Sequence, residues 1–337
     1  MNKISVLVLL FTAVALFTFT AHYNWMDVNI LTPETHLFTN DHHNEKIQRA
    51  SLKTQCDVEI KSNLYQTSRE YCQSPCTTNV LRNIKKYDRL VYNDKYKFIF
   101  CLVPKVGSSN WRRVLLVLSG KVNTSDPLSV SMKSVYSKYF RSLPYLASLP
   151  QEEISYRLKH YYKFIFVRDP LERLLSTYLN KFCGKNRFAW KKVGTRIIRA
   201  YRSEPTEAAV ASGLGVRFSE FIAYVVDSPV YSYNRHWQLI SIQSLPCEIK
   251  YDFVGHLNNA DADAKTVLDH LGVSHLVQYP ERDYDHKYAN TTSKLKEYYN
   301  KIPLSHLVKL VPIYNLDYLM FNLTIPPILQ NMLNKSN

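Results

Sequence analysis

The sequence predicts an α/β fold in which a central parallel sheet is flanked by helices. The apolar stretch YKFIF occurs at residues 96–100 and again at 162–166, and each copy runs into a short polar segment and then a helical pattern. Near-continuous apolar runs of this kind are typical of parallel strands covered on both faces. Of the 337 residues, 46% are hydrophobic and 21% are charged, which is a globular composition. From about residue 87 to 323, strand-like runs alternate with helical patterns, which supports the same class.

The net charge narrows the class of partner. Its formal value is +15, which indicates anionic partners such as nucleic acid, an anionic membrane surface, a phosphorylated cofactor or an acidic polysaccharide. Charge alone does not choose among these partners.

The amino-terminal segment predicts a membrane anchor. Residues 4–21 carry no charge and are about long enough to cross a bilayer core. Lys3 precedes this run and acidic residues follow it, so the positive-inside rule places residues 1–3 in the cytosol and gives type II topology. A cleaved signal peptide is the alternative, although Phe19 two positions before Ala21 makes a poor cleavage site. In either case the rest of the chain is lumenal or extracellular.

Other sequence features agree with an oxidising, lumenal compartment. Glycosylation triplets begin at Asn123, Asn290, Asn322 and Asn334. An even set of six cysteines allows up to three disulfides; these are Cys56, Cys72, Cys76, Cys101, Cys183 and Cys247. The spacing of Cys72 and Cys76 would permit zinc, but no Cys/His pair at finger spacing follows, so no metal is expected. Nucleic acid is not an expected partner in this compartment.

The remaining chain divides by composition. Residues 22–86 are polar, with only a weak helical pattern around 44–53, and are predicted to form a lumenal stem. Residues 87–325 are predicted to form the folded α/β domain, and residues 326–337 a carboxyl-terminal tail.

The first apolar repeat leads into a candidate anion-binding loop. Its strand ends at Pro104, and Lys105 and Gly107 follow before a helical pattern starts near Trp111. Backbone N–H groups of such a loop and of the first helical turn point at a ligand, and Lys105 adds a full charge. The loop is not a Walker A motif, since it lacks Gly-x-x-x-x-Gly-Lys-Ser/Thr. A β–α turn with a merely solvated lysine is the alternative.

The second repeat places Arg168 at the carboxyl end of its strand, where open α/β sheets bind ligands. Asp169 is predicted to be a helix N-cap and Pro170 the first helical residue, with Glu172 in a capping-box-like position. Ser176 lies two turns further on, where its hydroxyl would join Arg168 around a second phosphate. A purely capping role for Asp169 is the alternative.

Two anion-binding turns at one sheet edge suit a ligand with two separated phosphate groups. The motifs PKVGSSNW (residues 104–111) and FVRDPLERLLSTY (residues 166–178) resemble the 5′-phosphosulfate and 3′-phosphate motifs of the Golgi carbohydrate sulfotransferases. This group contains chondroitin, dermatan and N-acetylgalactosamine 4-O-sulfotransferases and the glucuronyl 3-O-sulfotransferase. Further blocks are similar in the same order, namely GTRIIRAYR, RFSEFIAYVVD, HW, PCEIKYDFVGHLNNADADA and YNLDYLMFNL.

The resemblance implies a P-loop-like sulfotransferase domain that uses 3′-phosphoadenosine 5′-phosphosulfate (PAPS) and no metal. It implies that Arg168 and Ser176 hold the 3′-phosphate and that Lys105 acts on the leaving phosphate in catalysis. The residues expected to bind the phosphosulfate end are Lys105, Val106, Gly107, Ser108, Ser109, Asn110 and Trp111. At Ser108 the family usually has Cys or another small residue, which should cost nothing because the loop binds through its backbone.

His236 is the candidate general base for the acceptor hydroxyl. It matches the HW block, an imidazole titrates near neutral pH, and the neighbouring Trp237 would stack on a sugar ring. A histidine bonded to backbone beside a core tryptophan is an equally good interpretation. His256 is a weaker candidate with a structural role as its alternative, and Glu172 is expected to be occupied by capping.

A run of basic residues suggests the acceptor surface. It comprises Lys181, Lys185, Arg187, Lys191, Lys192, Arg196, Arg199 and Arg202. Such a run is usually a solvated face, but its density directly after the second motif would suit a polyanionic glycan.

The sequence therefore predicts a Golgi type II membrane enzyme that transfers sulfate from PAPS to a glycan hydroxyl, the N-acetylgalactosamine 4-OH of chondroitin- or dermatan-type chains. The alternatives are a sulfotransferase acting on a terminal glycoprotein sugar, a non-catalytic basic glycan-binding protein of the same fold, and a lumenal P-loop kinase that depends on magnesium. The oligomeric state is not predicted.

Overall fold

The computed structural model describes residues 40–62, 65, 67–76, 87–136, 142–184, 186–281 and 291–334, with side chains from residue 50 onward. Chain contacts define one compact unit over Gln48–Asn337 and a separate one over Met1–Ile47. Within the described ranges no helix is both long and apolar enough to span a membrane. The predicted anchor at residues 4–21 lies outside those ranges.

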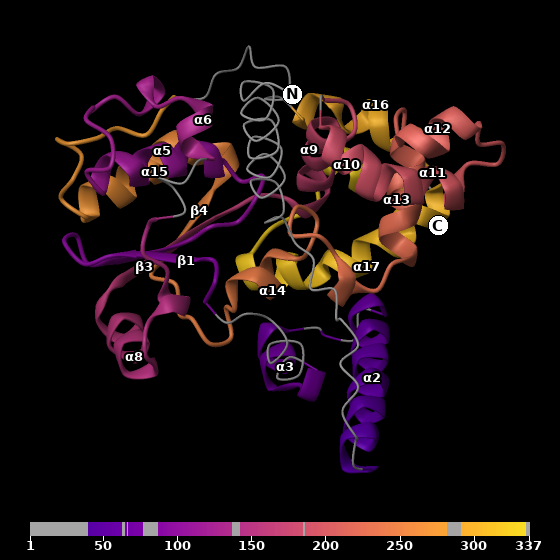
Figure 1. The fold of residues 1–337 in the computed structure, drawn as a ribbon, viewed down its shortest axis with the longest axis horizontal. Helices are drawn as coiled ribbons and strands as arrows, with labels where there is room; N and C mark the ends of the chain where they lie inside the picture. Colours follow the sequence, from indigo (N-terminus) through magenta and orange to yellow (C-terminus); the bar gives the residue numbers. More distant parts are fainter. Residues whose placement is uncertain are drawn as a thin grey trace, which may run out of the picture. The chain divides into compact units, whose positions relative to one another are not determined.

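The centre of the larger unit is a four-stranded sheet in the order β1-β2-β3-β4 (Figure 1). The strands are β1 (Leu90–Asn93), β2 (Phe98–Cys101), β3 (Tyr162–Val167) and β4 (Phe253–His256). Strands β2, β3 and β4 are parallel, as predicted, but β1 is antiparallel to β2. The predicted central parallel sheet is therefore confirmed in part: the sheet is mixed, because only residues 94–97 separate β1 from β2, and a connection that short permits only a hairpin.

The two YKFIF repeats supply the two central strands, but they pair two residues out of step. Phe98 lies opposite Tyr162, and Cys101 lies opposite Ile165. Because the strands are parallel, Lys105 and Arg168 both follow the carboxyl edge of the sheet. The parallel pairing of β2 and β3 therefore brings the Lys105 loop and Arg168 to the same edge of the sheet.

Aromatic packing joins the sheet to the first helix. Alternate strand side chains face α5 (Ser108–Leu118), where the ring centroid of Trp111 lies 5.2 Å from that of Phe100 and 5.0 Å from that of Phe164. Figure 1 shows α15 (Ala260–His270) on the same side of the sheet as α5. The helix α15 ends just before Gly272, which has a φ of 67°.

A second apolar cluster lies among the helices outside the sheet. It is built on α9 (Pro170–Lys181), α13 (Phe218–Asp227) and α17 (Leu304–Phe321). The predicted tail contains α18 (Pro327–Asn334), which packs on α17 and buries Leu329 completely. Residues 327–334 therefore belong to the fold.

The other elements are short. The α-helices are α6 (Met132–Val135), α8 (Gln151–His160), α10 (Arg187–Ala189), α11 (Thr195–Tyr201), α12 (Glu207–Ser212), α14 (Ile240–Ser244) and α16 (Leu295–Tyr299), and η3 (Trp190–Gly194) is a π-helix. The 3₁₀ turns are η1 (Pro127–Ser129), η2 (Leu146–Ser148), η4 (Val230–Ser232), η5 (Leu257–Asn259) and η6 (Thr292–Lys294).

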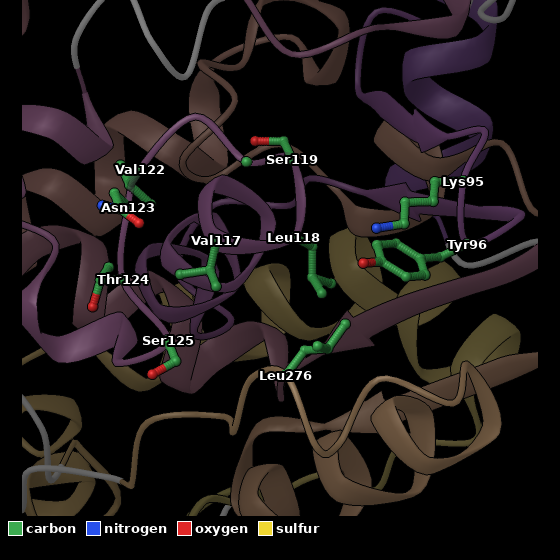
Figure 2. Close-up of a pocket in the computed structure, with 11 residues that line it drawn as sticks. Lys95, Tyr96, Val117, Leu118, Ser119, Val122, Asn123, Thr124, Ser125 and Leu276 are labelled. Carbon is green, nitrogen blue, oxygen red and sulfur yellow. The ribbon is translucent and has the colours of Figure 1, made fainter.

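A pocket of about 460 Å³ opens at the carboxyl end of α5 (Figure 2). Tyr96, Leu118 and Leu276 contribute apolar side chains to its lining, and Lys95 and Asn123 contribute polar ones. Because α5 begins directly after the Lys105 loop, the pocket and the loop lie at opposite ends of this helix. The pocket is thus separate from the candidate anion site.

The predicted stem is largely helical where it is described. It contains α2 (Asn40–Lys61), which extends well beyond the weak pattern at residues 44–53, and α3 (Ser68–Gln73). The helix α3 packs on α17. From Gln48 onward the predicted stem therefore belongs to the same compact unit as the predicted catalytic domain.

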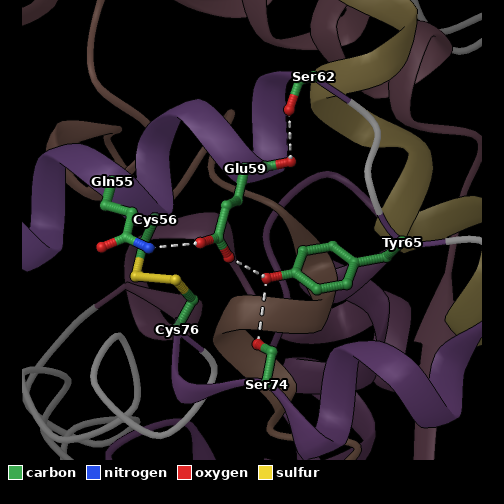
Figure 3. The surroundings of a disulfide bond; sticks show 7 residues. All are labelled: Gln55, Cys56, Glu59, Ser62, Tyr65, Ser74 and Cys76. Carbon is green, nitrogen blue, oxygen red and sulfur yellow. Dashed lines mark hydrogen bonds between the residues drawn. A yellow bond between two sulfur atoms is a disulfide. The ribbon is translucent and has the colours of Figure 1, made fainter.

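Disulfides join these amino-terminal helices to each other and to the domain. Cys56 pairs with Cys76, and Cys72 pairs with Cys247 across 175 residues of sequence. Figure 3 shows the surroundings of the first bond, where the Tyr65 hydroxyl donates to a Glu59 carboxylate oxygen at 2.8 Å. Cys101 and Cys183 form no disulfide in the described part of the chain, so two disulfides form there where the count allows three.

Candidate active site

The loop between β2 and α5 has an unusual backbone. Lys105 has a φ of 72° and Gly107 a φ of 82°, so both residues lie in the left-handed region. A non-glycine residue there is uncommon and is retained mainly where the surrounding structure requires it. A Cβ atom added to Gly107 would lie 2.7 Å from the Tyr279 hydroxyl oxygen. Both backbone angle and space therefore require glycine at position 107.

This backbone leaves a row of N–H groups available. The amides of Asn110 and Trp111 donate to the Gly107 carbonyl oxygen at 3.0 and 3.3 Å. The amides of residues 105–109 donate to no acceptor in the described part of the chain. Consecutive free amides at a helix start form an anion-binding concavity, because their dipoles converge on one point. The loop thus suits a phosphate or sulfate group.

Lys105 adds a titratable charge to this loop. Its side chain is half-buried. Burial, followed by the charges of Arg168 and Lys181, lowers the pKa of Lys105 to about 7. Positive charges gathered at this density favour an anionic ligand, which would offset their repulsion.

Arg168 connects the two motifs. Arg168 is 5% exposed, and its guanidinium lies 3.3 Å from a Glu172 carboxylate oxygen. The same group donates to the Lys105 carbonyl oxygen at 3.4 Å and to the Thr291 hydroxyl. These contacts fix Arg168 at the carboxyl edge of β3, directly beside the first loop.

The start of α9 agrees in part with its prediction. The Asp169 carboxylate caps the helix by accepting from the Glu172 amide at 2.7 Å, and Pro170 is the first helical residue. The capping role expected for the Glu172 side chain is wrong. Its carboxylate instead pairs with Arg168 and accepts from the Thr292 hydroxyl at 2.9 Å. Leaving the buried Arg168 guanidinium without a counter-charge would cost more free energy than leaving the helix without a second cap.

Ser176 is 4% exposed, on the second turn of α9 after its cap. Its hydroxyl makes no hydrogen bond to any described residue. A role for this hydroxyl beside Arg168 stays a prediction.

His236 is held in one orientation. Its Nδ1 lies 2.6 Å from the Asn234 Oδ1, which also accepts from the His236 amide at 3.1 Å. Because that oxygen is an acceptor, Nδ1 carries the proton and Nε2 is left with a free lone pair. Thr177 Oγ1 donates to the His236 carbonyl at 2.8 Å, which fixes the backbone. The ring therefore has the tautomer that a general base requires.

The electrostatic surroundings keep this imidazole neutral. Burial, followed by the charges of Lys181, Arg235 and Lys105, lowers the pKa of His236 well below its usual range. The same interactions show that a lysine of α9, the lysine of the loop and His236 share one site. The sequence analysis did not assign Lys181 or Arg235 to the site. In the sequence, Arg235 is marked only by its position next to His236, and Lys181 only by its place within the basic run.

Further cationic and aromatic groups lie beside the first helical turn. The Arg112 guanidinium lies 5.1 Å from the ring centroid of Tyr136, whose hydroxyl lies 2.9 Å from Ser109 Oγ. Burial lowers the pKa of Arg112, and the charges of Arg235 and Arg89 lower it further. Arg112 and Tyr136 were not predicted as site residues, because the pattern in this segment shows only an amphipathic helix.

The two tryptophans named from the sequence belong to the core. Trp111 is 1% exposed and packs on strand phenylalanines, so its indole does not line the anion loop. Trp237 is 4% exposed and packs edge-on against Phe221, so its ring is not open to a sugar. At the end of β4, His256 is held through its amide, which donates to an Asp263 carboxylate oxygen at 2.6 Å.

The protein is therefore an α/β protein in which the amide-lined loop and the buried Arg168 lie at one edge of the sheet. The comparisons with known proteins agree. Residues 88–324 match the family described as the sulfotransferase family. Carbohydrate sulfotransferase 11 of Mus musculus is 35% identical over 274 residues, covering 78% of this chain and 77% of that protein. Carbohydrate sulfotransferase 14 of Danio rerio is 37% identical over 287 residues, covering 82% and 76%.

A third relative, carbohydrate sulfotransferase 9 of Homo sapiens, is 37% identical over 242 residues, covering 71% of this chain and 54% of that protein. No solved structure matches the chain. The chain belongs to the sulfotransferase family, and it is a carbohydrate O-sulfotransferase that uses PAPS as its sulfate donor.

Proposed function

We propose that this enzyme transfers the sulfuryl group of PAPS to the 4-hydroxyl of N-acetylgalactosamine in chondroitin- or dermatan-type chains. The observation that carries the proposal is a neutral imidazole with a free Nε2, set among the cations of the anion site. The relatives named above are carbohydrate sulfotransferases, which supports a sugar hydroxyl as the acceptor.

The loop and the buried arginine fit the two ends of the donor. The free amides of residues 105–109 and the Lys105 ammonium would hold the phosphosulfate end. Arg168, already oriented by Glu172, would hold the 3′-phosphate together with Ser176. PAPS supplies an activated sulfuryl group whose leaving group is a phosphate.

His236 would act on the acceptor. Its Nε2 would take the proton of the acceptor hydroxyl as the new O–S bond forms and the S–O bond to the phosphate breaks. Lys105 would stabilise the negative charge that develops on the departing phosphate oxygen. Neutralisation of Lys105 and Lys181 by the donor's phosphates would raise the pKa of His236, making it a better base in the complex.

The test is transfer of labelled sulfate from PAPS to desulfated chondroitin, dermatan and heparan chains. We expect transfer to chondroitin or dermatan. The substitution His236→Ala should lower kcat by about 10²- to 10⁴-fold, the usual contribution of a general base, with unchanged donor affinity in calorimetry. His275→Ala, which removes an exposed imidazole elsewhere, is the control. Normal turnover in His236→Ala would exclude the base role, and transfer to heparan alone would exclude the proposed acceptor.

We further propose that residues 4–21 anchor the enzyme in the Golgi membrane with the catalytic domain in the lumen. The uncharged run after Lys3 and the disulfides of an oxidising compartment support this topology. Protease treatment of sealed Golgi vesicles should leave the domain intact unless detergent is present. Digestion without detergent would contradict the proposal.

A further inference from the structure

Five exposed cations lie on one short stretch of the chain that the donor site does not use. They are Arg187, Lys191, Lys192, Arg196 and Arg199, on α10, η3 and α11, and we refer to them as the basic strip. None of the five forms an ion pair or hydrogen bond with a side chain in the described part of the chain.

The structure divides the basic run found in the sequence. Lys181, at the end of α9, lies close enough to His236 to lower its pKa. Arg202 is paired with Glu220, with 2.8 Å between Nε and the carboxylate oxygen. Lys185 lies outside the described ranges. The basic strip is the part of the run that remains without Lys181, Lys185 and Arg202.

The backbone of the basic strip is firmly held. Ile197 and Ile198 are fully buried in the helical apolar cluster, so the opposite side of α11 faces outward. A Cβ atom added to Gly194 would lie 2.4 Å from the Gly213 carbonyl oxygen, so the π-helix packs directly on the backbone after α12. The cations therefore stand on a rigid surface.

Keeping these charges together costs stability. Lys192 and Arg196 are four residues apart and Arg199 follows three later, so like charges are neighbours on the helix surface. The nearest acidic residues in sequence, Glu204 and Glu207, are exposed and form no ion pair with the basic strip. An extended anion would relieve this repulsion along the whole row.

An aromatic ring lies within the row. Phe188 is 43% exposed, and the Lys192 ammonium lies 5.3 Å from its ring centroid. An exposed ring between cations gives an apolar surface for the face of a sugar, while the ammonium groups bind its acidic substituents. This combination suits an anionic polysaccharide better than a compact anion.

We propose that the basic strip is an exosite that binds the anionic acceptor polysaccharide away from the reacting hydroxyl. The inference rests on the proposed function and deepens it, because it assigns a separate surface to the part of the polymer that does not react. The helix α9 links the two regions: its amino terminus follows Arg168, its last residue Lys181 reaches the site, and the strip starts soon after it.

The test compares two variants with equal loss of charge. One carries Lys191→Ala, Lys192→Ala and Arg196→Ala, and the control carries Lys121→Ala, Lys159→Ala and Lys250→Ala, all exposed residues of other segments. In the strip variant we expect KM for desulfated chondroitin to rise about tenfold, the effect of three lost surface ion pairs. Its KM for a short acceptor oligosaccharide, its kcat and its donor affinity should stay unchanged.

Direct binding gives a second readout that does not depend on catalysis. Affinity for immobilised chondroitin without donor should fall in the strip variant and should depend less on salt than in the unmodified enzyme. An equal rise in KM in both variants, or an unchanged KM and affinity in the strip variant, would overturn the exosite. Loss of binding only to anionic vesicles would also overturn it. If no acceptor is sulfated, the proposed function fails, and the binding experiment still decides on the exosite.

Discussion

The charge of Lys105 should make donor binding depend on pH. Its pKa of about 7 means that the free enzyme loses this charge as the pH rises above neutrality. Affinity for adenosine 3′,5′-bisphosphate should therefore fall between pH 7 and 9, by up to about 10- to 100-fold, the effect of losing one charged hydrogen bond. Lys105→Arg should remove the pH dependence, because a guanidinium stays protonated. Calorimetry at several pH values measures this; a parallel pH dependence in the arginine variant would assign the titration to another group.

Asp169 should make the free energy of unfolding fall as the pH rises, whereas a carboxylate in an ion pair makes it rise. Burial raises its pKa from 3.8 to about 7 in the folded protein. Between these values the folded state binds more protons than the unfolded state, so its contribution to the free energy of unfolding falls as the pH rises toward 7 and then levels off. Asp169→Asn should abolish this slope and keep the helix cap, whereas Asp169→Ala should also lose about 1 kcal/mol of capping energy.

Urea unfolding between pH 5 and 8 measures the Asp169 effect. Asp126→Asn, at the exposed cap of η1, is the control because it changes the same chemical group without burial. An unchanged pH slope in Asp169→Asn would show that this carboxyl is not the titrating group.

At the scale of elements, the loop between β2 and α5 should be intolerant of a single methyl group. Gly107→Ala adds a Cβ beside the Tyr279 hydroxyl at a positive φ, so the loop must shift and its row of amides is lost. We expect donor affinity to fall by at least about tenfold, since several charged hydrogen bonds are misaligned. Gly120→Ala at the other end of α5 is the matched control, with a φ of 66° and no atom within 4 Å of the new Cβ. Equal donor affinity in the two variants would contradict this role for Gly107.

At the scale of the whole molecule, the amino-terminal helices should be required for stability. The bond between Cys72 and Cys247 closes a loop of 175 residues, which in the chain-entropy treatment corresponds to about 5 kcal/mol, against about 3 for the 20-residue loop of Cys56 and Cys76. Cys247→Ser should therefore destabilise the protein more than Cys56→Ser. Cys183→Ser, at an exposed cysteine outside both disulfides, is the control.

The bond between Cys72 and Cys247 also predicts that the stable domain begins before residue 87. A chain that begins at Asn40 should fold with both disulfides, whereas one that begins at Asp88 leaves Cys247 unpaired and should unfold at lower denaturant concentration. Urea unfolding of both chains measures this. Equal midpoints would show that the boundary predicted at residue 87 is the physical one.

The sequence by itself determined the local features of this protein. The repeated apolar strands, the glycine-containing loop with Lys105 and the cap formed by Asp169 and Pro170 can each be predicted from contiguous residues. Their conformations depend on backbone sterics and on hydrogen bonds within a few positions, so the signal is present in the order of residues.

Only the tertiary structure decided how distant groups combine. The pairing of Glu172 with Arg168, the burial of Trp237 and the approach of Lys181 to His236 depend on packing between segments far apart in the chain. The docking of the predicted stem through Cys72 has the same origin. Such contacts follow from the sum of many weak interactions, each compatible with several partners, and no local pattern encodes that sum.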